Sequence, residues 1–176
     1  MKNLVALLRG INVSGQKKIV MADLRQSLEK EGYENVRTYI QSGNIVFESE
    51  ESNPVSLAQK IEKIIQNDFG FEVPTLVISQ ESIRKIPDSN PFLKPGQETK
   101  ALYVGFMYEE PDERHVQALY EAPTQPDEFS LAYPFVFMKF SDGIGKSKMD
   151  NNFFERKLKI KMTSRNWNTI LKLSDM

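Results

Sequence analysis

The chain has 176 residues, of which 40% are hydrophobic and 27% charged, and it contains no cysteine. Such a composition is typical of a soluble globular protein with one domain or two small ones, and it excludes a disordered chain. The lack of cysteine excludes disulfides, thiolate metal sites and a cysteine nucleophile, and it favours a cytoplasmic location. No apolar run approaches the roughly 18 residues of a spanning helix, so we expect no membrane association.

The net charge of -1 conceals an uneven distribution along the chain. Residues 1–38 carry +3, residues 39–130 carry -9, and residues 131–176 carry +5. If the fold brings the two basic ends together, they form a positive face that attracts phosphates, nucleic acid or acidic partners. The alternative is a dipolar surface without a ligand.

The first half of the chain predicts six elements in a defined order. Apolar patterns indicate strands at 3–8, 35–40, 44–48 and 73–78, and helices at 21–31 and from Asn53-Pro54 to about Phe69. Gln41-Ser42-Gly43 predicts a short hairpin turn in which the glycine supplies a positive φ. The order strand, helix, strand, strand, helix, strand is the split βαβ or ferredoxin-like pattern.

The second half repeats this order after a short helix at 80–86 and a proline-rich linker at 87–98. Strands are expected at 99–106, 128–133 and 135–140, and helices at 112–120 and 150–158. In place of a closing strand we expect the short basic segment Lys159–Met162, then a helix from about Ser164. The predicted fold class is therefore α+β, with two ferredoxin-like subdomains, 1–86 and 99–176. Their antiparallel-rich sheets carry helices on one face.

Three segments carry a resemblance to a known family: residues 6–15 (ALLRGINVSG), 38–47 (TYIQSGNIVF) and 163–173 (TSRNWNTILKL). The chain resembles the bacterial family known as domain of unknown function 1697, over nearly its whole length. The resemblance implies no activity, cofactor or site residue. It does single out these three segments as the places to look for a shared surface.

The first candidate site is the loop that follows the first strand. Arg9, Asn12, Lys17 and Lys18 lie between that strand and the next helix, together with Gly10 and Gly15. A glycine-containing loop before a helix can hold an anion with its backbone N–H groups, and the lysines would add charge. The glycines are five residues apart, which matches neither the Rossmann nor the Walker A spacing. The alternative is that the two glycines serve turns while Arg9 anchors a carboxylate in the acidic half of the chain.

The predicted hairpin offers a second group. Arg37, Gln41 and Asn44 are close in sequence to Tyr39, and aromatic residues on central strands of ferredoxin-like RNA binders stack on bases. The characteristic sequence of that RNA-binding motif is absent. The alternative is that Asn44 and Gly43 serve the turn while the aromatic residues fill the core.

Two groups near the end of the chain complete the list. Lys146, Ser147 and Lys148 follow Gly143 and resemble the end of a P-loop, but the position of its first glycine is occupied by Phe140. Arg165, Asn166 and Trp167 are expected at a helix start, where they could stack on a base and bind a phosphate. The alternatives are a turn with solvated lysines, and a tryptophan packed in the core.

Catalytic and metal-binding patterns are weak. The only histidine, His115, lies in an acidic segment without a second histidine or a cysteine, so we expect no metal site and no cofactor. No serine stands in a nucleophile-elbow sequence.

Three functions remain open at this stage. All three rest on Arg9, Lys17 and Arg165 lying near one another. The first is a binding module for nucleic acid or a nucleotide. The second is an enzyme that acts on a small phosphorylated metabolite. The third is a protein-interaction or homodimerisation domain that presents a sheet edge.

Overall fold

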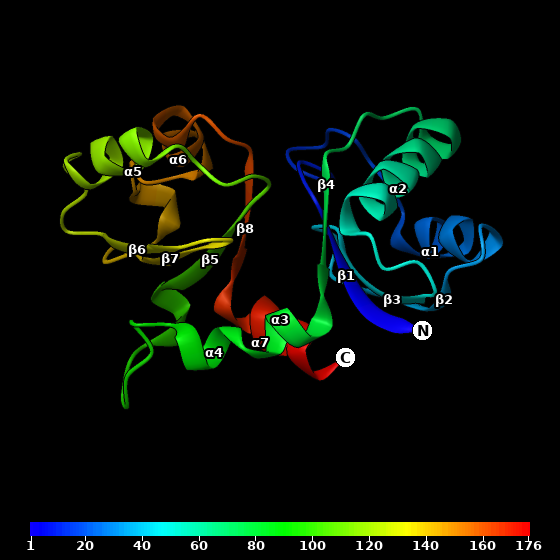
Figure 1. The fold of residues 1–176 in the computed structure, drawn as a ribbon, viewed down its shortest axis with the longest axis horizontal. Coiled ribbons are helices and arrows are strands. Elements are labelled where there is room, and N and C mark those ends of the chain that lie inside the picture. Colours follow the sequence, from blue (N-terminus) through cyan, green and yellow to red (C-terminus); the bar gives the residue numbers. More distant parts are fainter. The chain divides into compact units, whose positions relative to one another are not determined.

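A computed structural model describes residues 1–176. The chain forms two compact units, shown in Figure 1. The first unit comprises Met1–Lys85 together with Leu171–Met176, and the second comprises Ile86–Ile170. The sequence predicts subdomains at 1–86 and 99–176, which places residues 171–176 in the second subdomain. In the structure these residues cluster with the first unit. No helix is long and apolar enough to cross a membrane.

The first unit is built from β1 (Lys2–Leu8), α1 (Met21–Lys30), β2 (Glu34–Tyr39), β3 (Asn44–Ser49), α2 (Pro54–Phe69) and β4 (Thr75–Ser79). The strand order is β2-β3-β1-β4, and all neighbouring strands are antiparallel. This arrangement confirms the split βαβ unit predicted from the sequence.

Helices α1 and α2 form where the sequence predicts them. The Asn53 side chain caps α2 by accepting hydrogen bonds from the backbone N–H groups of Val55 and Ser56, and Gly70 ends the helix in a left-handed conformation. The two helices place their apolar stripes on one face of the sheet. The core of this face includes Leu4, Ala6, Leu8, Leu24, Leu28, Ile45, Phe47, Leu57, Ile61, Ile65 and Val77.

The second unit repeats the arrangement. Its elements are α4 (Ile86–Ser89), η1 (Thr99–Ala101), β5 (Leu102–Met107), α5 (Glu113–Tyr120), β6 (Glu128–Ala132), β7 (Phe135–Lys139), η2 (Ile144–Lys146), α6 (Asn151–Leu158) and β8 (Met162–Asn166). The strand order β6-β7-β5-β8 is the same order as in the first unit. The fold is therefore α+β with two ferredoxin-like sheets, as predicted.

The closing strand of the second unit corrects one expectation. The sequence places a helix start at about Ser164, but residues 162–166 form β8, which pairs with β5 through Val104 and Arg165. Helix α7 (Trp167–Asp175) begins only after it. The Asn166 side chain accepts a first-turn hydrogen bond from the Thr169 N–H at 2.9 Å.

The last residues of α7 belong to the first unit because they bond to α3 (Gln80–Arg84). The side-chain amide of Gln80, which is 1% exposed, donates to the carbonyls of Leu173 at 3.0 Å and Met176 at 2.9 Å. Arg84 donates to the carbonyl of Ser174. These bonds satisfy carbonyls at the end of α7 that have no partner within the helix.

Candidate anion-binding loop

The loop between β1 and α1 is closed by its own backbone. The N–H of Asn12 donates to the carbonyl of Lys17 at 3.2 Å, and the N–H of Gln16 donates to the carbonyl of Val13 at 2.9 Å. The tip residues Ser14 and Gly15 donate none of the backbone hydrogen bonds that close the loop. Both have positive φ, at 49° and 76°, and both are exposed. The tip therefore presents backbone N–H groups to solvent.

Asn12 holds this loop in place with three hydrogen bonds. Its Nδ2 donates to the carbonyls of Ile19 at 3.0 Å and Gln41 at 2.8 Å, and its Oδ1 accepts from the Ile19 N–H at 2.9 Å. Both Nδ2 hydrogens are used, so the amide of Asn12 positions the loop rather than offering a donor to a ligand.

Neighbouring segments fix the base of the loop. The N–H of Arg9 donates to the carbonyl of Pro74 at 3.0 Å, and the N–H of Leu8 donates to the carbonyl of Gly43 at 2.8 Å. Lys17 Nζ donates to the carbonyl of Glu72. The loop, the β2–β3 turn and the start of β4 thus meet at one end of the sheet.

Lys18 covers the tip of the loop. Its side chain is exposed, and its Cε lies 3.9 Å from the position that a Cβ on Gly15 would occupy. No ion pair joins Lys17 or Lys18 to a carboxylate. The Lys18 ammonium group can therefore reach an anion held by the tip N–H groups.

The hairpin residues divide between structure and surface. Asn44 is fully buried, and its Nδ2 donates to the Tyr39 carbonyl and the Ser42 hydroxyl, both at 3.0 Å. Gln41 is exposed at the turn that Asn12 contacts. Arg37 lies on the edge strand β2 and lines a shallow hollow with Glu29 and Glu48, so its surroundings are acidic.

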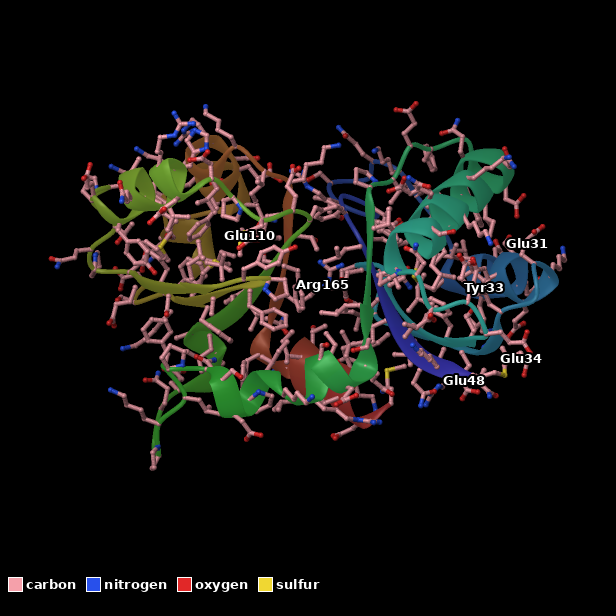
Figure 2. The ribbon with its side chains drawn as sticks, viewed as in Figure 1. Glu31, Tyr33, Glu34, Glu48, Glu110 and Arg165 are labelled. Carbon is pink, nitrogen blue, oxygen red and sulfur yellow. The ribbon has the colours of Figure 1, made fainter.

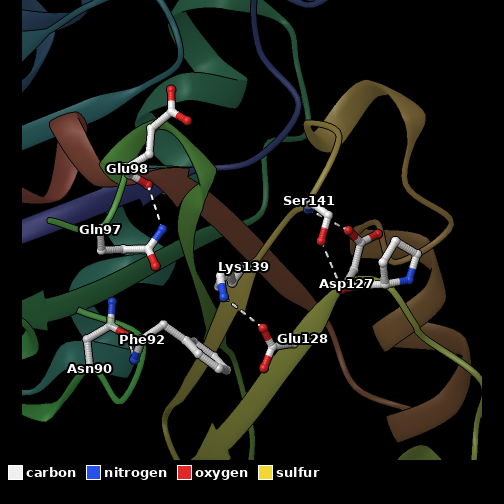
Figure 3. A network of polar contacts seen from close by, with 9 residues as sticks. Asn90, Phe92, Gln97, Glu98, Asp127, Glu128, Lys139 and Ser141 are labelled. Carbon is white, nitrogen blue, oxygen red and sulfur yellow. Dashed lines mark hydrogen bonds and ion pairs between the residues drawn. The ribbon is translucent and has the colours of Figure 1, made fainter. Parts of the chain in front are cut away.

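The second unit has a basic loop of its own, between β7 and α6. Asp127 Oδ1 accepts from the Ser141 N–H at 2.9 Å, as Figure 3 shows, and the Ser147 hydroxyl donates to Asp127 Oδ2. Ser147 also accepts from the Met149 N–H at 2.9 Å. Ser147 and Asp127 therefore fix the loop, whereas Lys146 and Lys148 are exposed. The role of Asp127 depends on partners 14 and 20 residues away and carries no local sequence signal.

Arg165 is enclosed in the second unit. The residue is 7% exposed, and its Nη1 donates to the Thr163 hydroxyl at 2.8 Å and to the Ser164 carbonyl at 2.9 Å. Burial lowers the pKa of the guanidinium to about 10, so it stays protonated at neutral pH. Trp167 is buried, with 2% of its surface exposed, whereas the preceding residue, Asn166, is exposed. Figure 2 labels Arg165 among the surrounding side chains. Arg9 and Lys17 belong to the first unit, and Arg165 belongs to the second.

No group of three or more histidine or acidic side chains is arranged to hold a metal ion. His115 lies in the first turn of α5, where its N–H donates to the carbonyl of Asp112 at 3.0 Å.

Two ferredoxin-like units, with a basic loop at the end of the first sheet, define an α+β protein. The chain belongs to the family described as protein of unknown function (DUF1697), whose model matches residues 1–137. The segment 163–173 lies beyond that match. The structure of the conserved bacterial protein SP0830 from Streptococcus pneumoniae is similar, with 26% identity and a TM-score of 0.77. The similarity covers 99% of this chain and 97% of that one. No curated protein matches the chain.

Proposed function

We propose that this protein is a binding module for a phosphate-bearing ligand, held at the tip of the β1–α1 loop. The observation that carries the proposal is the position of the Lys18 side chain over Gly15, beside tip N–H groups that are not used to close the loop. A phosphate oxygen accepts hydrogen bonds from such N–H groups, and an ammonium group adds a charge-assisted bond.

The other members of the site have distinct roles. Asn12 fixes the loop through its bonds to Ile19 and Gln41, and Lys17 fixes it through the Glu72 carbonyl. Arg9 stands at the base of the loop and contributes positive charge. Lys146 and Lys148 form a second basic loop, which belongs to the second unit and is a separate candidate. A nucleotide or a single-stranded nucleic acid has the required chemistry.

The test is a titration of the ¹⁵N-labelled protein with inorganic phosphate, then a mononucleotide, then a single-stranded oligonucleotide. We expect amide shifts at Ser14, Gly15 and Lys18, and weaker binding in Lys18→Gln. Lys30→Gln, which removes an exposed lysine from the end of α1, is the matched control. Absence of tip shifts with all three probes would show that the loop is not an anion site.

The salt dependence then identifies the kind of ligand. If the protein binds a polyanion, the logarithm of the affinity falls linearly with that of the salt concentration, with a slope of about -0.7 per phosphate contacted on a single strand. Charge reversal at Lys18 should reduce that slope. A mononucleotide that binds as tightly as the oligonucleotide, with little salt dependence, indicates a small-molecule site.

A further inference from the structure

A groove on the first unit, remote in sequence from the β1–α1 loop, lies where the end of α1 meets one side of α2. Its volume is about 360 Å³, and it is lined by Glu31, Tyr33, Lys60, Lys63, Ile64, Asn67 and Asp68. This volume is within the range of small-molecule sites, roughly 300 to 1,000 Å³. Figure 2 labels Glu31 and Tyr33 at this side of the unit.

Tyr33 is the feature that sets this groove apart from other surface hollows. The residue is only 8% exposed, and its ring packs edge-on against Phe47 with centroids 5.2 Å apart. Its hydroxyl makes no hydrogen bond within the chain and lies where solvent can reach it, so it is open to a partner from outside the chain. Since Tyr33 lines the groove, a ligand in the groove can supply that partner.

The position of Tyr33 is set by the end of α1. Gly32, with φ of 88°, turns the chain after the helix, and the Tyr33 N–H donates back to the carbonyl of Leu28 at 3.2 Å. The ring is thereby fixed against the core, so the hydroxyl has little freedom to turn away. A fixed polar group loses less entropy on binding a ligand than a mobile one.

The charges around Tyr33 have both signs. Burial, followed by the carboxylates of Glu51 and Glu31, raises the pKa of the Tyr33 hydroxyl, so it is neutral at physiological pH and can both donate and accept. Lys60 Nζ is engaged by Glu51 Oε2 at 2.6 Å. Lys63 has no such ion pair and is the cation available to a ligand, while Glu31 and Asp68 are the available carboxylates.

The residues from α2 fall on one side of the helix. Lys60, Lys63, Asn67 and Asp68 are spaced by three, four and one residues, next to the buried stripe that contains Ile64. Because a helix rises about 1.5 Å per residue, Lys63 and Asp68 are offset by roughly 7 Å along its axis. The groove therefore has a basic part and an acidic part within the length of a small molecule.

We propose that this groove binds a small ligand that carries both an ammonium and a carboxylate group, of the size of a free amino acid or a dipeptide. The ligand's ammonium group lies in the acidic part of the groove, with Glu31, Asp68 and the Tyr33 hydroxyl. Its carboxylate is bound by Lys63, with Asn67 able to donate to it. A simple polyanion is disfavoured by Glu31 and Asp68, and a simple cation by Lys60 and Lys63.

The test uses the dipeptide Ala-Ala at millimolar concentration, with amide shifts of the ¹⁵N-labelled protein as the readout. N-acetyl-Ala-Ala lacks the ammonium group, and Ala-Ala amide lacks the carboxylate. We expect saturable shifts at Tyr33, Lys63 and Asn67 with the free dipeptide, and binding about tenfold weaker with either blocked form, since each loses one charge-assisted bond. Equal shifts with all three peptides, or none with any, overturn the proposal.

Variants separate this site from the phosphate loop. Tyr33→Phe keeps the ring against Phe47 and removes only the hydroxyl, so the fold is retained and dipeptide affinity falls severalfold. Lys63→Gln weakens the free dipeptide but leaves the amidated form unchanged. Lys18→Gln, which affects the proposed phosphate site, leaves dipeptide binding unaltered. Full dipeptide affinity in both Tyr33→Phe and Lys63→Gln would place the ligand elsewhere.

Discussion

The side-chain amide of Asn12 joins two segments 29 residues apart, because its Nδ2 lies 2.8 Å from the carbonyl oxygen of Gln41. The same side chain makes two further bonds to Ile19. This one residue holds the β1–α1 loop to both the β2–β3 turn and the start of α1. The geometry of the proposed phosphate site thus depends on a residue that does not itself contact the ligand.

Replacing Asn12 with alanine should lower the free energy of unfolding by about 1 to 3 kcal/mol, because the partly buried N–H and carbonyl of Ile19 and the exposed carbonyl of Gln41 lose their partner. Urea unfolding measures the change. Val13→Ala, at a neighbouring residue that is 59% exposed, is the control and should have an effect within about 0.5 kcal/mol. An equal loss in both variants would mean that the Asn12 bonds contribute little to stability.

Replacing Gly43 or Gly70 with alanine separates two losses of stability, one from steric overlap and one from backbone strain. Both have positive φ, but a Cβ on Gly43 would lie 2.6 Å from Leu8 Cβ, whereas a Cβ on Gly70 would have no neighbour within 4 Å. Gly70→Ala should destabilise by about 1 kcal/mol, from backbone strain alone. Gly43→Ala should cost about 2 to 4 kcal/mol, since overpacking adds to the strain. Thermal unfolding of the two variants gives the comparison, and similar losses would contradict it.

Tyr120 protects the open edge of the second sheet. Its hydroxyl accepts a hydrogen bond from the Leu131 N–H of edge strand β6 at 3.2 Å, and its ring lies 5.0 Å from that of Phe129. Tyr120→Phe keeps the ring contact and exposes the strand N–H. We expect severalfold faster hydrogen exchange at Leu131 and a stability change below about 1 kcal/mol. Tyr133→Phe, which alters another exposed tyrosine, serves as the control. Unchanged hydrogen exchange at Leu131 in Tyr120→Phe would show that the Tyr120 hydroxyl does not protect this N–H.

Asp112 makes stability depend on pH in the acid range. Hydrogen bonds from the Arg114 side chain, then from its N–H, lower the pKa of this carboxyl from 3.8 to about 2. The ionised form is therefore favoured in the folded state, so its contribution is present above pH 3.8 and is lost as pH falls to about 2. The difference in urea midpoint between wild type and Asp112→Asn should shrink over this interval. A difference that is constant from pH 5 to pH 2 would refute the assignment.

The order of elements could be predicted because local patterns specify it. The Asn53 cap, the Gly43 turn and the continuous apolar run from Leu4 to Leu8 all indicate the elements that form. Strand β8 could not be predicted, since Met162–Asn166 has polar residues where apolar alternation was expected. Its pairing with β5 decides the structure there, and pairing between distant segments overrides local preference.

The candidate sites were predictable only in part. The glycine-containing loop and its lysines are visible in the sequence, but the bonds that commit Asn12 and Ser147 to the fold come from distant segments. The groove at Tyr33 was missed because Lys60, Lys63 and Asp68 resemble an ordinary solvated helix face. Only the burial of the tyrosine against Phe47, which the sequence does not reveal, makes that face distinctive.

The docking of residues 171–176 onto Gln80 has a consequence for synthesis of the chain. During translation the first unit emerges with the amide of Gln80 lacking both of its carbonyl partners, because residues 86–170 must be made first. At bacterial or eukaryotic elongation rates that interval is on the order of ten seconds. The first unit can therefore complete its contacts with residues 171–176 only after the whole of the second unit has been synthesised.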